Sequence, residues 1–266
     1  MSILPRPMTR RDNGYPTSDG KPMAETDYHR DLMFDLIATL RAYYAEQENV
    51  YVSGNLLLFY EENNRRKHIS PDVFVVQGVG KYQRPNYLLW DERPPAFVIE
   101  LTSKSTRNED LTTKMALYQD VLKVQEYFLF DPCQDYLDPS MQGWRLRSGT
   151  YRRIRPVAGR LPSRTTGLHL EREGTVLRLW DPATGERLLL PVEEAEERAE
   201  QAEELLATAQ VQIAAQVQGR WETQRHMMAE KLARQTAEAS AVESAREVAR
   251  LRREIAALRG EAPPVE

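Results

Sequence analysis

The sequence contains one cysteine, Cys133, and this excludes an internal disulfide bond. It has no apolar run that approaches the roughly 18 residues needed to cross a bilayer as a helix. The first residues, MSILPRPMTRRDNGYP, lack the apolar core of a signal peptide. Because disulfides form and persist in oxidising compartments, these absences together favour a soluble cytoplasmic protein.

Motifs of several enzyme classes are also missing. No spacing of Cys and His suits a zinc site, no glycine-rich loop is suited to hold a phosphate, and no Ser/His/Asp arrangement is evident. The chemistry of this chain must therefore be sought among its carboxylates, lysines and arginines.

The charge is unevenly distributed along the chain, whose formal net charge is −4. Residues 192–266 contain 15 Glu, no Asp and 10 Lys plus Arg, which leaves 26 basic and 25 acidic residues in the rest. The acidic total therefore says little about what the rest of the chain binds, and nucleic acid is neither required nor excluded.

Composition divides the chain into four regions. Residues 1–22 are rich in Pro, Arg, Gly and Asp and are expected to form a flexible arm. Residues 23–191 show the periodicity of a globular domain. Residues 192–258 are dominated by Ala, Glu, Arg and Gln, and residues 259–266 are expected to form a disordered tail.

Hydrophobic periodicity predicts the elements of the globular region. Thr26 and Asp27 offer a helix N-cap before apolar residues at helical spacing, and residues 81–95 are expected to form a loop. Strands are predicted at 51–60, 73–76, 97–101 and 126–132, and an amphipathic helix at 108–122.

The predicted elements combine into a mixed α/β domain. The helix at 108–122 lies between two apolar strands, and this order predicts a right-handed βαβ unit with parallel strands. Residues 143–156 and 174–191 are predicted to form antiparallel hairpins at the sheet edge. We therefore expect one central sheet.

The region 192–258 is predicted to form a coiled-coil helix. The register of its apolar residues breaks near Gln216 and Arg220 and then resumes. A seam of this length favours self-association, whereas a lone solvated helix or partial disorder is the alternative. The first part of the seam consists of Ala195, Ala199, Ala202, Leu206, Ala209 and Ile213, and the second of Val248, Leu251, Ile255 and Leu258.

Two carboxylates stand where core strands begin or end. Asp72 precedes four apolar residues, and Glu100 lies where the hydrophobic run FVIEL ends. On neighbouring strands, both side chains would reach one point at the sheet edge. Two carboxylates and water are ligands that a hard divalent cation such as Mg²⁺ accepts.

Each of these residues also has a simpler interpretation. Asp72 follows a proline and is suited to bind backbone N–H groups in a turn. Glu100 is able to pair with an arginine or to cap the next segment. Lys114 has a partner in Asp110, four residues earlier on the predicted helix.

The order of the motifs resembles a known family. SPDVFVV (70–76), FVIELTSKST (97–106), KMALYQ (114–119) and VQEYFLFDP (124–132) are together similar to the Uma-two family of restriction endonucleases, in the PD-(D/E)XK nuclease superfamily. The resemblance extends over about residues 25–191 and is most specific over 70–132. It implies a restriction-endonuclease-like fold, in which helices flank a central mixed sheet with a metal site at one edge.

The resemblance also implies roles for individual residues. Asp72 and Glu100 match the acidic residues of the motif, which bind Mg²⁺ or Mn²⁺. The superfamily pattern places a lysine where this chain has Thr102, but in the Uma-two family the lysine lies on the next helix, at Lys114. Lys104, in the turn, is the second choice. The implied activity is hydrolysis of DNA phosphodiester bonds, with Lys114 orienting the attacking water or stabilising charge on the phosphate.

Further residues are candidates for a supporting role. Glu25 opens the first predicted helix, where related nucleases sometimes carry another acidic metal ligand, although a favourable interaction with the helix dipole is the alternative. His29 is expected to be a surface histidine. Tyr118 and Asp131 are expected in the core and at a strand end, and with Gln119 they are candidates to support the site.

Arginines gather in the segment from Arg145 to Arg164, where Trp144 and Tyr151 lie among them. A nuclease needs a basic surface to hold phosphates, but solubilising arginines on an exposed hairpin give the same pattern. The candidates for nucleic-acid binding are Arg145, Arg147, Arg152 and Arg153.

Two functions follow from the sequence. The first is a metal-dependent endonuclease that self-associates through its C-terminal helix. The second is a non-catalytic module that binds nucleic acid or protein on the same fold, oligomerised by the same helix. They differ in whether Asp72 and Glu100 share one face of the sheet.

Overall fold

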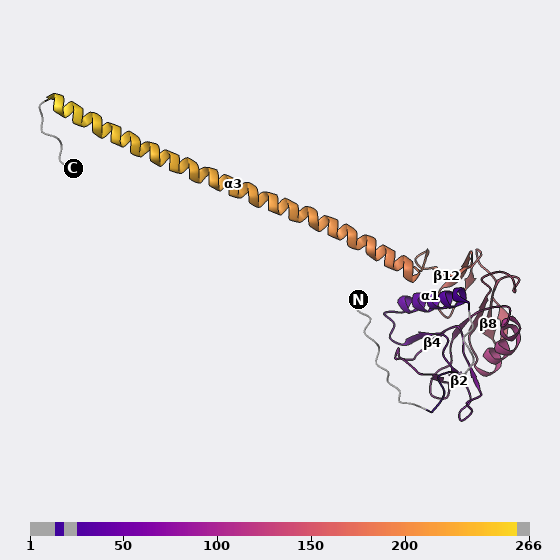
Figure 1. Ribbon diagram of the computed structural model, residues 1–266. Coiled ribbons are helices and arrows are strands. Elements are labelled where there is room, and N and C mark those ends of the chain that lie inside the picture. The colour runs from indigo at the N-terminus through magenta and orange to yellow at the C-terminus, as the bar shows by residue number, and fades with distance from the viewer. Residues whose placement is uncertain (1–13, 19–25, 260–266) are drawn as a thin grey trace. The chain divides into compact units, whose positions relative to one another are not determined.

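The computed structural model describes residues 14–18 and 26–259 of the 266-residue chain (Figure 1). The chain divides near Ala195 into a globular unit and a second unit that consists of helix. The candidate ligand Glu25, most of the predicted N-terminal arm and residues 260–266 lie outside the described residues.

The globular unit is built around a six-stranded mixed sheet, which confirms the predicted α/β class. β6 and β7 run parallel and every other neighbouring pair is antiparallel, so the predicted βαβ unit and the edge hairpin β8–β9 are also confirmed. In order across the sheet, the strands are β1 (Val50–Ser53), β4 (Val73–Gln77), β6 (Phe97–Leu101), β7 (Glu126–Phe130), β8 (Met141–Arg147) and β9 (Thr150–Arg153).

Helix α1 (Asp27–Tyr43) covers one face of this sheet (Figure 1). The helix begins where the sequence predicts, because the Thr26 side chain accepts a hydrogen bond from the His29 backbone N–H at 3.3 Å. Its buried residues, among them Leu36 and Leu40, share one core cluster with Ile99 of β6.

A second helical stretch covers the opposite face. It consists of α2 (Arg107–Glu109) and two π-helical segments, η1 (Asp110–Lys114) and η2 (Leu117–Val121), close to the predicted range of 108–122. Tyr118 and Leu122 pack here against β-strand residues of a second core cluster. Because both faces are covered, all five residues of β6 and of β7 are buried, as their continuous apolar sequences require.

The single strand predicted at 51–60 is wrong, because the chain turns at Gly54 and Asn55. A Cβ atom on Gly54 would lie 1.9 Å from the Asp72 carbonyl oxygen, so only glycine fits there. Asn55 has a φ of 46°, which ends the strand. The residues that follow, β2 (Leu58–Phe59), pair instead with β3 (His68–Ile69) and with β5 (Tyr87–Leu88) in a three-stranded sheet.

The hairpin at 174–191 belongs to a separate sheet and not to the edge of the central one, so the expectation of a single sheet is wrong. Its main strand pairs over five residues with a preceding strand whose polar sequence, HLERE, conceals it. Leu170, Leu177 and Leu179 of this sheet join the core cluster under α1. In order, the strands are β10 (Leu161–Pro162), β11 (His169–Glu173), β12 (Val176–Asp181) and β13 (Glu186–Arg187).

Helix α3 (Pro191–Arg259) is continuous over 69 residues and includes the predicted coiled-coil region. Proline at the first helical position and glutamates in the first turn suit a helix N-terminus. None of its residues is buried. No helix among the described residues is both long and apolar enough to cross a membrane.

Candidate active site

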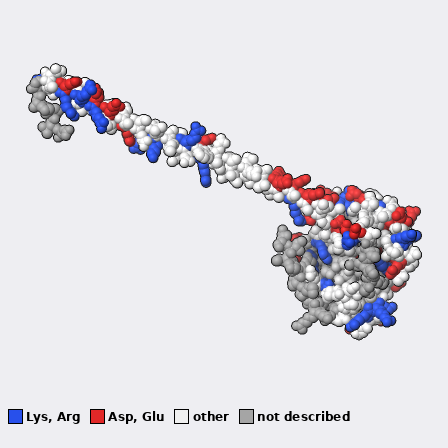
Figure 2. Space-filling view, viewed as in Figure 1, with Lys and Arg blue, Asp and Glu red and all other residues white. Residues whose placement is uncertain are grey.

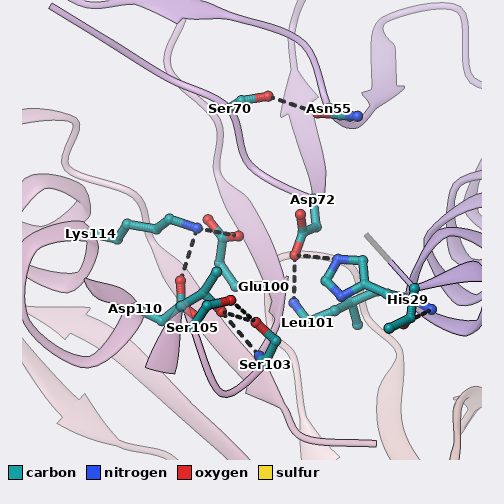
Figure 3. A network of polar contacts seen from close by, with 12 residues as sticks. His29, Asn55, Ser70, Asp72, Glu100, Leu101, Ser103, Ser105, Asp110 and Lys114 are labelled. Carbon is teal, nitrogen blue, oxygen red and sulfur yellow. Dashed lines mark hydrogen bonds and ion pairs between the residues drawn. The ribbon is translucent and has the colours of Figure 1, made fainter. Parts of the chain in front are cut away.

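Asp72 and Glu100 lie beside each other at one end of the central sheet. β4 and β6 are antiparallel with Val73 opposite Ile99, so the next pair in this register is Asp72 and Glu100. Paired positions on antiparallel strands direct their side chains to the same face. Both carboxylates therefore lie on one face of the sheet, and Figure 3 shows Glu100 between Lys114 and Asp72.

The carboxylate of Glu100 is fully buried, with 0% of the residue exposed. Its Oε2 atom accepts a hydrogen bond from the Lys114 ammonium at 2.9 Å, and its Oε1 atom accepts one from the Tyr118 hydroxyl at 2.6 Å. Burial raises the pKa of Glu100 to about 8, and the negative charges of Asp72 and Asp110 act in the same direction, against Lys114 and Tyr118. The group thus lies in a site that strongly resists negative charge.

Lys114 connects two buried carboxylates. Its Nζ atom is 2.9 Å from Glu100 and 2.9 Å from Asp110, which is itself 1% exposed. Burial alone would lower the pKa of Lys114, but the surrounding carboxylates outweigh burial and hold this pKa above its ordinary value. The simple Asp110–Lys114 pair and the contact with Glu100 are therefore present at the same time.

The spacing of four residues explains how one helical stretch places three polar side chains over Glu100. Asp110, Lys114 and Tyr118 are spaced by four residues, and residues four apart lie on one face of a helix. The Tyr127 hydroxyl of β7 donates to the Asp110 carbonyl oxygen at 3.0 Å and ties this turn to the sheet.

Asp72 is the more accessible of the two strand-end carboxylates, with 14% of its side chain exposed. Its Oδ2 atom accepts a hydrogen bond from the Leu101 backbone N–H at 2.7 Å and lies 3.5 Å from Nε2 of His29. The prediction that His29 is a surface residue is wrong. Because the first turn of α1 lies beside the start of β4, the His29 side chain is only 13% exposed.

The cluster carries an excess of negative charge. When all its groups are ionised, Asp72, Glu100 and Asp110 contribute three negative charges against one positive charge from Lys114. Within the described residues, no three His, Cys, Asp or Glu side chains are grouped so as to hold a metal ion. Mg²⁺ needs only one or two carboxylates beside water and phosphate oxygens, so the oxygen donors of Asp72 and Glu100 fit this ion.

Comparison with known proteins agrees with the family resemblance that the order of the motifs indicated. The model of the Uma2 family, described as "Putative restriction endonuclease", matches residues 5–177. The chain belongs to the Uma2 family.

Among solved structures, the chain is similar to that of a "putative nuclease belonging to DUF820" from Anabaena variabilis. The two are 16% identical, with a TM-score of 0.42, and the match covers 58% of this chain and 85% of the other. No curated protein matches the chain at a significant level. The Uma2 match ends within β12, so α3 lies outside it.

Three positions of this Uma2 protein bear on which lysine contacts Glu100. Thr102, where the superfamily pattern has lysine, is 3% exposed, and its hydroxyl has no hydrogen-bond partner in the described part of the chain. Lys104 is exposed in the turn after β6. Lys114 is the lysine that contacts Glu100.

Gln119 and Asp131 contact the backbone rather than the Glu100 cluster. The Gln119 side chain accepts a hydrogen bond from the Tyr151 N–H at 2.7 Å and so joins η2 to β9. The buried Asp131 carboxylate accepts backbone N–H groups of the following loop, including that of Tyr136 at 2.6 Å. Both residues organise loops and strands of the Uma2 domain.

The four candidate arginines lie on both faces of the β8–β9 hairpin. Arg145 and Arg152 are cross-strand partners, whereas Arg153 is opposite Trp144 on the other face. Arg145 pairs with the buried Glu126 at 2.6 Å and donates to the Pro162 carbonyl oxygen at 2.8 Å. Sequence reasoning missed Glu126, although a glutamate opening a buried strand is a visible signal. The remaining arginines, Arg147, Arg152 and Arg153, are exposed.

Proposed function

We propose that this Uma2 protein is a metal-dependent endonuclease that hydrolyses DNA phosphodiester bonds. The observation that supports the proposal most strongly is the meeting of Asp72, Glu100 and Lys114 where β4 begins and β6 ends. An excess of negative charge around two oxygen ligands suits a divalent cation, and the family description supports the same class of reaction.

Asp72 and Glu100 would hold Mg²⁺ or Mn²⁺, and Glu25 is retained as a proposed further ligand. When bound, the metal supplies polarisation of a phosphate oxygen and a more acidic water. The chain's own contribution is orientation, because the Leu101 N–H fixes the Asp72 carboxylate and the Tyr118 hydroxyl fixes that of Glu100. Because both carboxylates are already held in position, little free energy is needed to reorient them during the reaction.

Lys114 is suited to act on the phosphate. An ammonium has three N–H donors, and the contacts with Glu100 and Asp110 account for two of them. The third is able to donate to a phosphate oxygen or to the attacking water, where it would stabilise the charge that develops. The exposed Arg147, Arg152 and Arg153 are proposed to contact DNA phosphates around the site.

Self-association through α3 is the second part of the proposal. The helix exposes large apolar side chains along its length, including 60% of Leu206, 61% of Ile213 and 50% of Ile255. A face of this kind is stabilised in water when a partner covers it.

One observation favours the non-catalytic alternative. Both carboxylate oxygens of Glu100 already accept hydrogen bonds, and the residue is fully buried. A Glu100–Lys114–Asp110 cluster that stays closed would act as a structural support, and the fold would then bind nucleic acid or protein without cutting it.

A cleavage assay separates the two functions. Single- and double-stranded DNA are incubated with the full-length protein with and without Mg²⁺, alongside Asp72→Asn, Glu100→Gln and Lys114→Met variants. We expect Mg²⁺-dependent cleavage and a loss of about 100-fold or more in each variant, the scale seen when one group that stabilises a transition state is removed. Glu109→Gln, an exposed residue on the same helical stretch, is the matched control.

Two results would contradict the proposed nuclease activity. Cleavage that survives both carboxylate substitutions would remove Asp72 and Glu100 from the site. DNA binding without cleavage at any Mg²⁺ or Mn²⁺ concentration would favour the non-catalytic module.

A further inference from the structure

The two parts of the apolar seam of α3 share one heptad frame. Ala195 and Ala237 are 42 residues apart, which is six heptads, so the two parts of the seam lie on the same face of a supercoiled helix. The residues between the two parts, 216–234, form a polar insert, because most of their a and d positions hold polar side chains while the heptad register continues through them. The a positions are 192, 199, 206, 213, 220, 227, 234, 241, 248 and 255, and the d positions are 195, 202, 209, 216, 223, 230, 237, 244, 251 and 258.

From this frame we infer that α3 pairs with α3 of a second copy in an antiparallel arrangement centred on residue 225. The inference rests on the proposed self-association and specifies its geometry. In an antiparallel coiled coil, an a residue of one helix faces a d residue of the other. Centring on residue 225 meets this condition in every layer, because positions equidistant from 225 are always one a and one d.

Side-chain size supports the antiparallel arrangement. The apolar part before the insert is rich in alanine, and the part after it is rich in larger residues. Ala195, Ala199 and Ala202 would face Ile255, Leu251 and Val248 of the partner subunit, and Leu206 and Ile213 would face its Ser244 and Ala237. Each of these layers combines a small with a larger side chain, which keeps the packing even along the pair. A parallel pair would instead stack each of these residues on its own copy, so that alanine would face alanine at 195, 199 and 202 and a large side chain would face itself at 206, 213, 251 and 255.

Charge in the polar insert supports the same arrangement. Arg220 occupies an a position and Glu230 a d position, and in the antiparallel pair Arg220 faces the partner's Glu230. This ion pair occurs twice in the dimer by symmetry. In a parallel pair, Arg220 and Glu230 would each face an identical charge in the core of the coil, which is destabilising.

The ends of the helix also carry opposite net charge. Residues 191–210 contain seven Glu and one Arg, whereas residues 243–259 contain three Glu and five Arg. Figure 2 shows the acidic side chains gathered along the first part of α3. An antiparallel pair places each acidic end against a basic end. At a rise of 1.5 Å per residue, the two Pro191 residues would then lie about 100 Å apart.

Engineered cysteines test the orientation in the full-length chain. Cys133→Ser first removes the exposed native thiol. Ala209→Cys and Ala241→Cys are then made singly and together, because Ala209 would face the partner's Ala241 in a layer of two small residues. We expect the double variant to form disulfide-linked dimers under mild oxidation and both single variants to stay unlinked, since a disulfide needs Cα atoms within about 7 Å. Ala207→Cys with Ala239→Cys, both off the seam, is the matched control.

Mass and cross-linking together distinguish the possible failures. Light scattering under reducing conditions is expected to give a dimer. A dimer in which each single variant cross-links by itself would overturn the antiparallel arrangement and leave self-association intact. A monomer would overturn both.

A charge exchange provides a second test without cysteines. Arg220→Glu would place a second negative charge opposite the partner's Glu230 in both symmetry-related layers. It is expected to raise the dimer dissociation constant about tenfold or more. The double change Arg220→Glu with Glu230→Arg restores the opposite charges and is expected to return the constant to within about threefold of the original. A double variant as weak as the single one would overturn the register.

Discussion

Glu100 and Glu126 are both fully buried glutamates on the neighbouring parallel strands β6 and β7, yet their surroundings differ in kind. Glu126 accepts hydrogen bonds from the Arg145 guanidinium, the Ser163 hydroxyl and the backbone N–H groups of Arg164 and Thr165. Glu100 accepts one from Lys114 and one from Tyr118, with Asp72 and Asp110 close enough to oppose its charge.

The difference separates a structural carboxylate from a candidate catalytic one. The donors around Glu126 come from β8 and from the loop after β10, so its negative charge holds two sheets together. Around Glu100 the carboxylates outnumber the cation, and such an arrangement costs stability unless a further positive group arrives. Burial alone therefore does not distinguish the two glutamates, whereas the balance of charge around each of them does.

The largest expected effect comes from the same substitution made at both glutamates. Glu126→Gln removes a charge that four donors hold and is expected to lower the free energy of unfolding by about 3 kcal/mol, with the DNA cleavage rate per folded molecule unchanged. Glu100→Gln relieves repulsion from Asp72 and Asp110 and is expected to cost less than about 1 kcal/mol while abolishing cleavage. Urea unfolding and the cleavage assay measure the two quantities. Equal losses of stability in the two variants would contradict the distinction between a structural glutamate and a candidate catalytic one.

Added metal is expected to stabilise the protein by binding beside Glu100 and not beside Glu126. At a Mn²⁺ concentration of 100 times the dissociation constant, a site present only in the folded state stabilises the protein by about 2.7 kcal/mol. We expect this gain in the wild type and in Glu126→Gln, and its absence in Asp72→Asn, whose side chain lies outside the hydrophobic core clusters. Thermal unfolding with and without Mn²⁺ measures it. A gain that persists in Asp72→Asn would place the metal elsewhere.

The strands that carry both glutamates could be predicted from the sequence because their signals are local. Continuous apolar runs identify β6 and β7, and Thr26 marks the start of α1. Glu100 could be recognised from the sequence because it is a charged residue within such an apolar run. The resemblance of the motif order to the Uma-two family then implied Lys114 as a partner, which spacing alone would have paired with Asp110.

The parts that sequence reasoning missed depend on tertiary contacts. The helical stretch packs on the sheet so that Lys114 contacts Asp110 and Glu100 at the same time, and this joins Asp110 to the Glu100 cluster. His29 is partly buried because α1 begins beside β4. The strand β11 has a polar sequence that becomes a strand through pairing with β12.

The stability of the metal-free protein should depend on pH through Glu100. Its pKa is about 8 in the folded protein and near 4.5 when unperturbed, so the folded state binds more protons between these values. Stability therefore falls as pH rises from about 5 to 8. Glu100→Gln should reduce this slope, as measured by urea unfolding in the presence of a chelator. A slope that Glu100→Gln leaves unchanged would contradict the raised pKa.

The smallest effect is expected at an exposed ion pair away from the seam. Arg250 and Glu247 of α3 are 3.3 Å apart with side chains 70% and 51% exposed. Because water and salt screen both charges, Arg250→Ala should change the free energy of unfolding by no more than about 0.5 kcal/mol, and less still at high salt. The same urea titrations measure it. A cost as large as that of Glu126→Gln would show that an ion pair contributes equally whether exposed or buried, and the contrast between Glu100 and Glu126 would then no longer rest on their surroundings.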